Sequence, residues 1–90
     1  MIKSLSILVS GRVQGVFFRA SAKAKADELG IAGMVRNEPN GKVYIEAEGE
    51  EGPLLLFETW CREGPRLAYV EGVEVLDISV RGYQEFRIVR

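Results

Sequence analysis

The residues best suited to chemistry lie between positions 10 and 19, where Gly11 and Gly15 precede Arg19. A loop that enters a helix exposes unpaired backbone N–H groups at the positive end of the helix dipole, and glycines let these groups converge. An arginine within about one turn can add two parallel hydrogen bonds to a phosphate-sized anion. The segment therefore predicts an oxyanion site. Its spacing alone fits equally well a plain strand-to-helix connection with a solvated arginine.

Other kinds of chemistry are excluded by the residues that the chain lacks. It has no histidine and one cysteine among 90 residues, which removes imidazole catalysis, histidine metal ligation and an intrachain disulfide. Gly15 is followed by Val16 rather than by Lys and Ser or Thr, so the loop is not a nucleotide-binding P-loop. Cys61 falls on a predicted apolar helix stripe and is expected in the core.

The acidic residues of the second half lack the spacing of metal ligands, so we expect a solvated acidic face and neither a metal nor a cofactor. These residues are Glu46, Glu48, Glu50, Glu51 and Asp77.

The composition predicts one small globular domain over residues 1–90, with 47% hydrophobic and 28% charged residues. The net charge is -1, but residues 1–45 carry +4 and residues 46–90 carry -5, and no carboxylate precedes Asp27. An anion therefore belongs near the first helix, whereas the overall charge argues against a nucleic acid or a membrane as partner. The sequence opens on no leader pattern, and the single cysteine fits a reducing compartment; we expect a monomer in the cytoplasm.

Hydrophobic periodicity divides the chain into strands and two helices. The first helix is expected to begin at about Phe18 and to end at Gly30, and the second to carry Pro53 in its first turn and to stop at Gly64. The predicted strands cover residues 4–10, 32–37, 42–48, part of 68–76, and 86–88. This order predicts an α+β fold, the ferredoxin-like split βαββαβ sandwich, with two helices on one face of a mainly antiparallel sheet and a short C-terminal strand.

Two segments carry a resemblance to a known family. Residues 11–19 read Gly-Arg-Val-Gln-Gly-Val-Phe-Phe-Arg and residues 33–43 read Gly-Met-Val-Arg-Asn-Glu-Pro-Asn-Gly-Lys-Val. Both resemble the signature segments of the acylphosphatase family, and Gly64-Pro65 and Phe86-Arg87-Ile88 are similar to its later landmarks. The resemblance implies metal-independent hydrolysis of small acyl phosphates to a carboxylate and inorganic phosphate, with phosphate acting as product and inhibitor.

The resemblance also implies roles for individual residues. Arg19 would hold the phosphoryl group, and Asn37 would orient the attacking water. The backbone of the phosphate-binding loop would assist through Arg12, Val13, Gln14, Gly15, Val16, Phe17 and Phe18. Read without the resemblance, Asn37 would be an ordinary turn residue.

The implied chemistry suits the residues that are present. Phosphoryl transfer depends on positioning and charge stabilisation, which amides and one arginine supply. The leaving carboxylate needs little protonation, so the reaction does not require a histidine as general acid. Because Asn37 cannot deprotonate water, we infer that the proton goes to a phosphoryl oxygen of the substrate.

Two positions depart from the family pattern. Met34 stands where many members have an aromatic residue, which we expect to alter the packing behind Asn37. Glu38 stands where some members have a hydroxyl residue, and its carboxylate would weaken phosphate binding unless it points to solvent.

Two other functions fit the same fold. An RNA-binding module would need aromatic residues on its third strand, but residues 41–49 offer one, Tyr44, beside Glu46 and Glu48. The second alternative is a catalytically silent domain of the acylphosphatase type that binds an anion or a protein. Measured turnover would distinguish it from the enzyme. We expect Arg12 and Arg36 to be solvated surface residues that at most steer anions.

Overall fold

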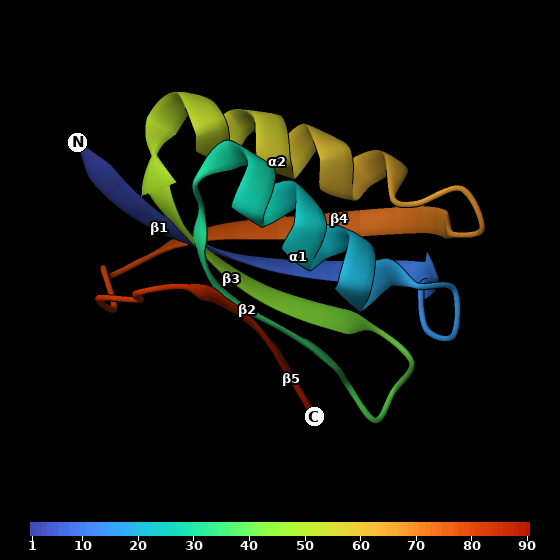
Figure 1. The fold of residues 1–90 in the computed structure, drawn as a ribbon. Coiled ribbons are helices and arrows are strands. Elements are labelled where there is room, and N and C mark those ends of the chain that lie inside the picture. The colour runs from blue at the N-terminus through green and yellow to red at the C-terminus, as the bar shows by residue number, and fades with distance from the viewer.

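The computed structural model describes all 90 residues, arranged as a five-stranded sheet with two helices (Figure 1). The elements are β1 (Ile2–Arg12), α1 (Phe18–Leu29), β2 (Ala32–Asn37), β3 (Val43–Glu50), α2 (Glu51–Glu63), β4 (Tyr69–Ile78) and β5 (Phe86–Val89). The strand order is β4-β1-β3-β2-β5, with β2 and β5 parallel and all other neighbours antiparallel. Both helices cover one face of the sheet (Figure 1). The predicted ferredoxin-like fold class is confirmed.

The helices form where the apolar spacing places them. In α1, Phe18, Ala22 and Ala26 are buried on one face, and Gly30 closes the helix in the left-handed conformation that glycine adopts without strain. In α2, the buried residues are Leu54, Phe57 and Cys61. Neither helix is long and apolar enough to cross a membrane.

The core lies between these helices and the inner face of the sheet. Ile7 and Val9 of β1 and Ile45 of β3 are completely buried there. The ring of Phe57 meets the ring of Phe86 at 5.8 Å in an edge-on contact. This contact ties β5, which joins the sheet at its edge, to α2.

Strand β1 is longer than expected, because it continues past Ser10 through Gly11 to Arg12. The register with β4 shifts between Ser10 and Gly11, and an added Cβ at Gly11 would overlap the carbonyl oxygen of Tyr69. Gly11 therefore permits a close approach of two strands. The expectation that it shapes the anion-binding loop is wrong, and the loop begins at Val13.

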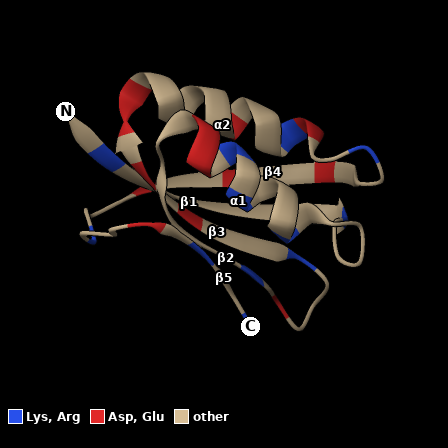
Figure 2. Ribbon diagram, in the orientation of Figure 1, with Lys and Arg blue, Asp and Glu red and all other residues tan.

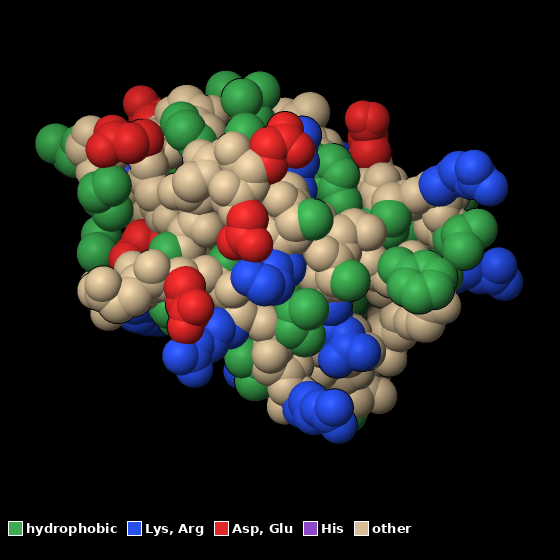
Figure 3. Space-filling view, viewed as in Figure 1, with side chains coloured by type: hydrophobic (Ala, Val, Ile, Leu, Met, Phe, Trp, Pro, Cys, Tyr) green, Lys and Arg blue, Asp and Glu red, His purple; other side chains and the backbone are tan.

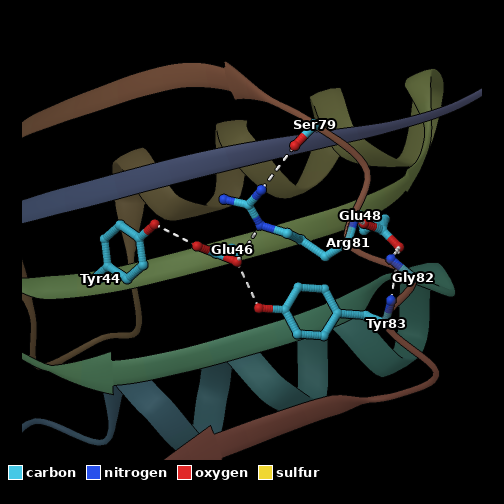
Figure 4. A network of polar contacts seen from close by, with 7 residues as sticks. All are labelled: Tyr44, Glu46, Glu48, Ser79, Arg81, Gly82 and Tyr83. Atoms are coloured by element: carbon cyan, nitrogen blue, oxygen red, sulfur yellow. Dashed lines mark hydrogen bonds and ion pairs between the residues drawn. The ribbon is translucent and has the colours of Figure 1, made fainter.

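The expectation of a solvated acidic face is wrong for Glu46 and Glu48, because the link between β4 and β5, residues 79–85, crosses that face (Figure 4). Glu48 is only 6% exposed and accepts backbone N–H bonds of 2.7, 3.0 and 2.9 Å from Arg81, Gly82 and Tyr83. Glu46 accepts hydroxyl bonds of 2.7 Å from Tyr44 and 2.6 Å from Tyr83. These carboxylates fix the link to the sheet.

The expectation holds for the remaining three acidic residues, Glu50, Glu51 and Asp77, which are exposed. Glu50 pairs with the N-terminal amino group and Glu51 with Lys3. Exposed pairs of this kind contribute little to stability.

Candidate active site

A cavity of about 690 Å³ lies where β1 passes through its loop into α1, beside the ends of β2 and β5. It is lined by Val13, Gly15, Phe17, Phe18, Arg19, Ala20, Asn37, Ile88 and Arg90. The segments that contribute are far apart in sequence: β5 pairs in parallel with β2, and α1 packs against both strands. This arrangement brings Arg19 and Asn37 to the same hollow, as their assigned roles require.

The loop presents a continuous run of free hydrogen-bond donors. From residue 13 to residue 20, no backbone N–H donates a hydrogen bond within the chain; the first helical bond runs from the N–H of Ser21 to the carbonyl of Phe17. Gly15 has φ of 75° and Phe17 has φ of 66°, so the chain is left-handed at two points of this run. Left-handed residues within a loop turn successive N–H groups toward one side, which favours binding of an anion.

Arg19 is half-buried in the first turn of α1, and it forms no ion pair and no hydrogen bond within the protein. Five of the twelve lysines and arginines lack a carboxylate partner, and Arg19 and Arg90 are the two of them that line the cavity. The five residues are Arg12, Arg19, Lys42, Arg66 and Arg90. An unpaired guanidinium has all its donors available for the oxygens of a ligand.

The surroundings of the cavity are basic. No acidic residue lines it, and the first turn of α1 carries none to offset the helix dipole. Helix α1 carries Arg19, Lys23 and Lys25 before its first carboxylate, Asp27 in the last turn, and the β1–α1 loop carries no charge (Figure 2). In the space-filling view, basic side chains dominate the lower right of the molecule, and acidic ones lie mainly along its upper and left parts (Figure 3). A dianion is thus attracted to this end of the molecule.

Asn37 is the last residue of β2 and shares the inner face of that strand with Val35. Its Oδ1 atom is buried and accepts no hydrogen bond within the protein. Buried polar atoms are rarely left without a partner, and those that are need an explanation. Because Asn37 also lines the cavity, a water bound beside its carboxamide is the candidate partner for this oxygen, and orienting a water is the task that the family resemblance gives to Asn37.

Gln14 joins the two halves of the site. Its Nε2 donates hydrogen bonds of 2.8 Å to the carbonyl oxygen of Glu38 and 2.9 Å to that of Lys42. These two carbonyls belong to the turn between β2 and β3, immediately after Asn37. The family resemblance placed Gln14 in the phosphate-binding loop through its backbone, and the structure adds that its side chain links this loop to the turn.

The predicted loop residues take different positions in the structure. The side chains of Gln14 and Val16 do not line the cavity, although the backbone N–H groups of both are free. Arg12 ends β1, is exposed and lies outside the cavity lining. Arg36 pairs with Glu38 and covers the ring of Tyr44 at 4.8 Å, so it takes no part in the cavity.

Three lining residues were missed from the sequence: Ala20, Ile88 and Arg90. Ile88 and Arg90 come from the end of the chain, where residues 86–88 were predicted to be a strand. A strand of four residues does not reveal its own neighbour, and only the parallel pairing of β5 with β2 brings it to Asn37.

Both departures from the family pattern fall outside the cavity. Met34 lies on the opposite side of β2 from Val35 and Asn37, so the expectation that it alters the packing behind Asn37 is wrong. The carboxylate of Glu38 accepts a bond of 2.8 Å from Arg36 Nε and does not line the cavity. Its negative charge is therefore partly neutralised beside the site.

The fold and cavity together define a small α+β protein with a basic cavity, suited to an anion, at its first strand-to-helix loop. The profile of the acylphosphatase family matches residues 5–88. An acylphosphatase of Methylococcus capsulatus is 48% identical over 90 residues, covering 99% of this chain and 98% of its own. The chain belongs to the acylphosphatase family.

Solved structures agree with this assignment. The acylphosphatase from Coxiella burnetii has a TM-score of 0.95 at 40% identity, covering 98% of this chain and 93% of its own. The acylphosphatase from Bacillus subtilis has a TM-score of 0.95 at 37% identity and covers 100% of both chains.

Proposed function

We propose that this chain is an acylphosphatase enzyme that hydrolyses small acyl phosphates to a carboxylate and inorganic phosphate, without a metal. One observation carries the proposal: a run of free backbone N–H groups, an unpaired arginine and an orphaned carboxamide oxygen share one cavity. The first two features suit a phosphoryl group, and the third suits the water that attacks it.

The phosphoryl group is held by charge-assisted hydrogen bonds. The loop amides and the Arg19 guanidinium surround its non-bridging oxygens, over which the negative charge of the transition state is spread. Both kinds of donor are in place before the substrate arrives, so little reorganisation is needed during reaction. Gln14 holds the loop against the turn that follows Asn37, which keeps the donors and the water site in register.

The hydrolytic step needs no side chain that takes up a proton. Asn37 Oδ1 accepts one O–H of the water and directs a lone pair of its oxygen at phosphorus. A new P–O bond forms as the bond between phosphorus and the acyl oxygen breaks, and the electron pair of that bond leaves on the carboxylate. The second proton of the water passes to a phosphoryl oxygen, so the products are the carboxylate and dihydrogen phosphate, which then releases a proton to solvent according to the pH.

The geometry supports three further parts of the proposal. Inorganic phosphate fits the same donors as the substrate and should inhibit competitively. One chain supplies every group that the reaction uses, which favours a monomer as the active form. Burial raises the pKa of the Cys61 thiol, and this unpaired cysteine supports a cytoplasmic site of action.

Release of phosphate from acetyl phosphate in excess EDTA tests the activity directly. We expect turnover above the uncatalysed rate, with competitive inhibition by added inorganic phosphate. The matched control is the double variant Arg19→Ala, Asn37→Ala, which should retain the far-UV spectrum of the parent. If the parent chain releases no more phosphate than this control yet binds phosphate in calorimetry, it is the catalytically silent alternative, and the proposed activity is wrong.

A further inference from the structure

The cavity is larger than its anion-binding groups require. Its volume of about 690 Å³ lies within the range of roughly 300–1,000 Å³ that is typical of sites for whole small molecules. A phosphoryl group held by the loop amides and Arg19 fills only part of this space. The remainder must receive whatever is attached to the phosphoryl group, which in an acyl phosphate is the acyl group.

Phe17 is the most exposed apolar residue in the lining. Its side chain is 73% exposed, and its ring takes part in none of the aromatic contacts, which join Phe18, Phe57, Trp60 and Phe86. Ile88, at 43% exposed, adds a second apolar side chain to the same lining. Most of the Phe17 ring and a part of the Ile88 side chain are not covered by the protein, so this apolar surface is available to a ligand.

The backbone conformation at Phe17 is unfavourable for a phenylalanine. Phe17 is the only non-glycine residue with positive φ, at φ 66° and ψ 23°, a conformation that disfavours large side chains. It also occupies the N-cap of α1, where it supplies no side-chain hydrogen bond. Glycine or asparagine would satisfy both the backbone and the cap at lower cost. The phenyl group at this position therefore serves neither the loop nor the core.

We propose that Phe17, together with Ile88, contacts the acyl group of the substrate and makes the enzyme prefer acyl phosphates with an apolar acyl group, aromatic ones above all, to acetyl phosphate. This assignment rests on the proposed hydrolysis of acyl phosphates. The phosphoryl group binds to the charged donors, and the acyl group packs against the apolar side chains. No Asp or Glu side chain lines the cavity to repel or specifically bind a polar acyl group.

The preference is tested by comparing kcat/KM for benzoyl phosphate and acetyl phosphate in the parent and in Phe17→Asn and Phe17→Gly. Both replacements tolerate the left-handed backbone, so the loop keeps its conformation. We expect each to lower the benzoyl-to-acetyl ratio about 10-fold, through a higher KM for benzoyl phosphate, as for loss of an apolar pocket contact. The intrinsic reactivities of the two substrates cancel when variants are compared. Phe17→Tyr, which retains the ring, should preserve the ratio.

Leu67→Asn is the control, because Leu67 is 57% exposed but lies outside the cavity, and it should leave the ratio unchanged. An equal loss of activity toward both substrates in the Phe17 variants would show that the ring acts only through the loop and would overturn the inference. An unchanged ratio would overturn it as well. Failure of the parent to hydrolyse either substrate would instead overturn the proposed function.

Discussion

At the scale of the residue, Arg19 and Asn37 divide the work of the site. Arg19 is a half-buried cation with no carboxylate partner, and in the proposed mechanism the phosphoryl group supplies its counter-charge. Asn37 has a buried oxygen with no hydrogen-bond donor, and in the proposed mechanism the attacking water supplies one. The proposal thus assigns one residue to the anion and the other to the nucleophile.

This division predicts different kinetic effects for the two residues. We expect Arg19→Ala and Asn37→Ala each to lower kcat about 10²–10³-fold, by analogy with the removal of one oxyanion donor. Only Arg19→Ala should also raise the inhibition constant of phosphate, because Asn37 holds the water. Arg19→Lys should recover little, since a lysine lacks the planar fork of donors. Steady-state kinetics with phosphate as inhibitor measure both constants.

Arg66→Ala is the matched control, because Arg66 is exposed, has no ion-pair partner and lies outside the cavity. Its kinetics should equal those of the parent. A near-normal kcat in either site variant would remove that residue from the mechanism.

At the scale of the element, the site depends on contact between the β1–α1 loop and the β2–β3 turn. The turn is closed by its own hydrogen bonds, from Glu38 N–H to the Lys42 carbonyl and from Gly41 N–H to the Glu38 carbonyl, whereas the loop backbone has no such bonds. Gln14 connects them through a single amide group with two carbonyl partners. The position of Asn37 relative to the loop donors is therefore set partly by a side chain that does not line the cavity.

We predict that Gln14→Met lowers both stability and turnover. The replacement keeps the length of the side chain but removes the amide donor that joins the loop to the carbonyls of Glu38 and Lys42, each of which keeps one backbone donor within the turn. We expect the free energy of unfolding to fall by about 2 kcal/mol, as for two lost hydrogen bonds, and kcat to fall about 10-fold as Asn37 shifts. Urea unfolding and acetyl phosphate kinetics measure the two effects.

Thr59→Val provides the comparison, because Thr59 donates a bond of 3.0 Å to the Leu55 carbonyl on α2, away from the cavity. This variant should keep full kcat. If Gln14→Met also kept full kcat while losing stability, the link would hold the fold but not the site.

The elements were largely predictable, and the reasons for the failures are physical. Helix α1 and strand β2 were placed correctly because apolar spacing and Gly30 define their ends. The end of β1 was placed too early, because a glycine within a strand has the same sequence pattern as a glycine within a loop. Residues 79–85 have no periodicity, so nothing in them indicated that they cross the sheet and bury Glu48.

The site was predictable only in part for a related reason. The place of Arg19 after the loop indicated a possible anion site but fitted a solvated arginine equally well. The roles predicted for Arg19 and Asn37 both needed the family resemblance, because an asparagine before a turn also has an ordinary explanation. Ile88 and Arg90 needed the sheet order, which depends on long-range pairing that short strands do not encode locally.

At the scale of the whole molecule, charge is separated between the site and the opposite face of the sheet. On that face Glu46 receives hydrogen bonds from two tyrosines and lies 3.5 Å from the Arg81 guanidinium (Figure 4). Burial by itself raises the pKa of Glu46, but the bonds from Tyr83 and Tyr44 and the charge of Arg81 outweigh it, so the pKa lies below its ordinary value of 4.5.

This shift predicts a specific pH dependence of stability. Because the folded state holds ionised Glu46 more strongly than the unfolded state does, its contribution is present above pH 4.5 and is lost as the pH falls below that value. The difference between the urea midpoints at pH 7 and at pH 3 should therefore be smaller in Glu46→Gln than in the parent. Glu63→Gln, at an exposed position, should leave the parent's pH dependence intact. Equal pH dependence in the Glu46 variant and the parent would contradict the prediction.

The bond between Tyr83 and Glu46 also makes stability depend on pH in alkali, where stability falls as the pH rises. Burial and the bond to Glu46 raise the pKa of Tyr83 to about 12 from 10.0, so its contribution is present below pH 10 and is lost as the pH rises toward 12.

The parallel pairing of β5 with β2 brings Arg90 to the rim of the cavity. Met1 precedes β1, and the cavity lies beyond the opposite end of β1, after Arg12. A purification tag or fusion partner attached after Arg90 would emerge directly over the opening and compete with incoming substrate. The same polypeptide attached before Met1 would leave the opening clear. Recombinant material intended for assay should be extended at its amino end, and an extension at the other end offers a way to build a tethered inhibitor.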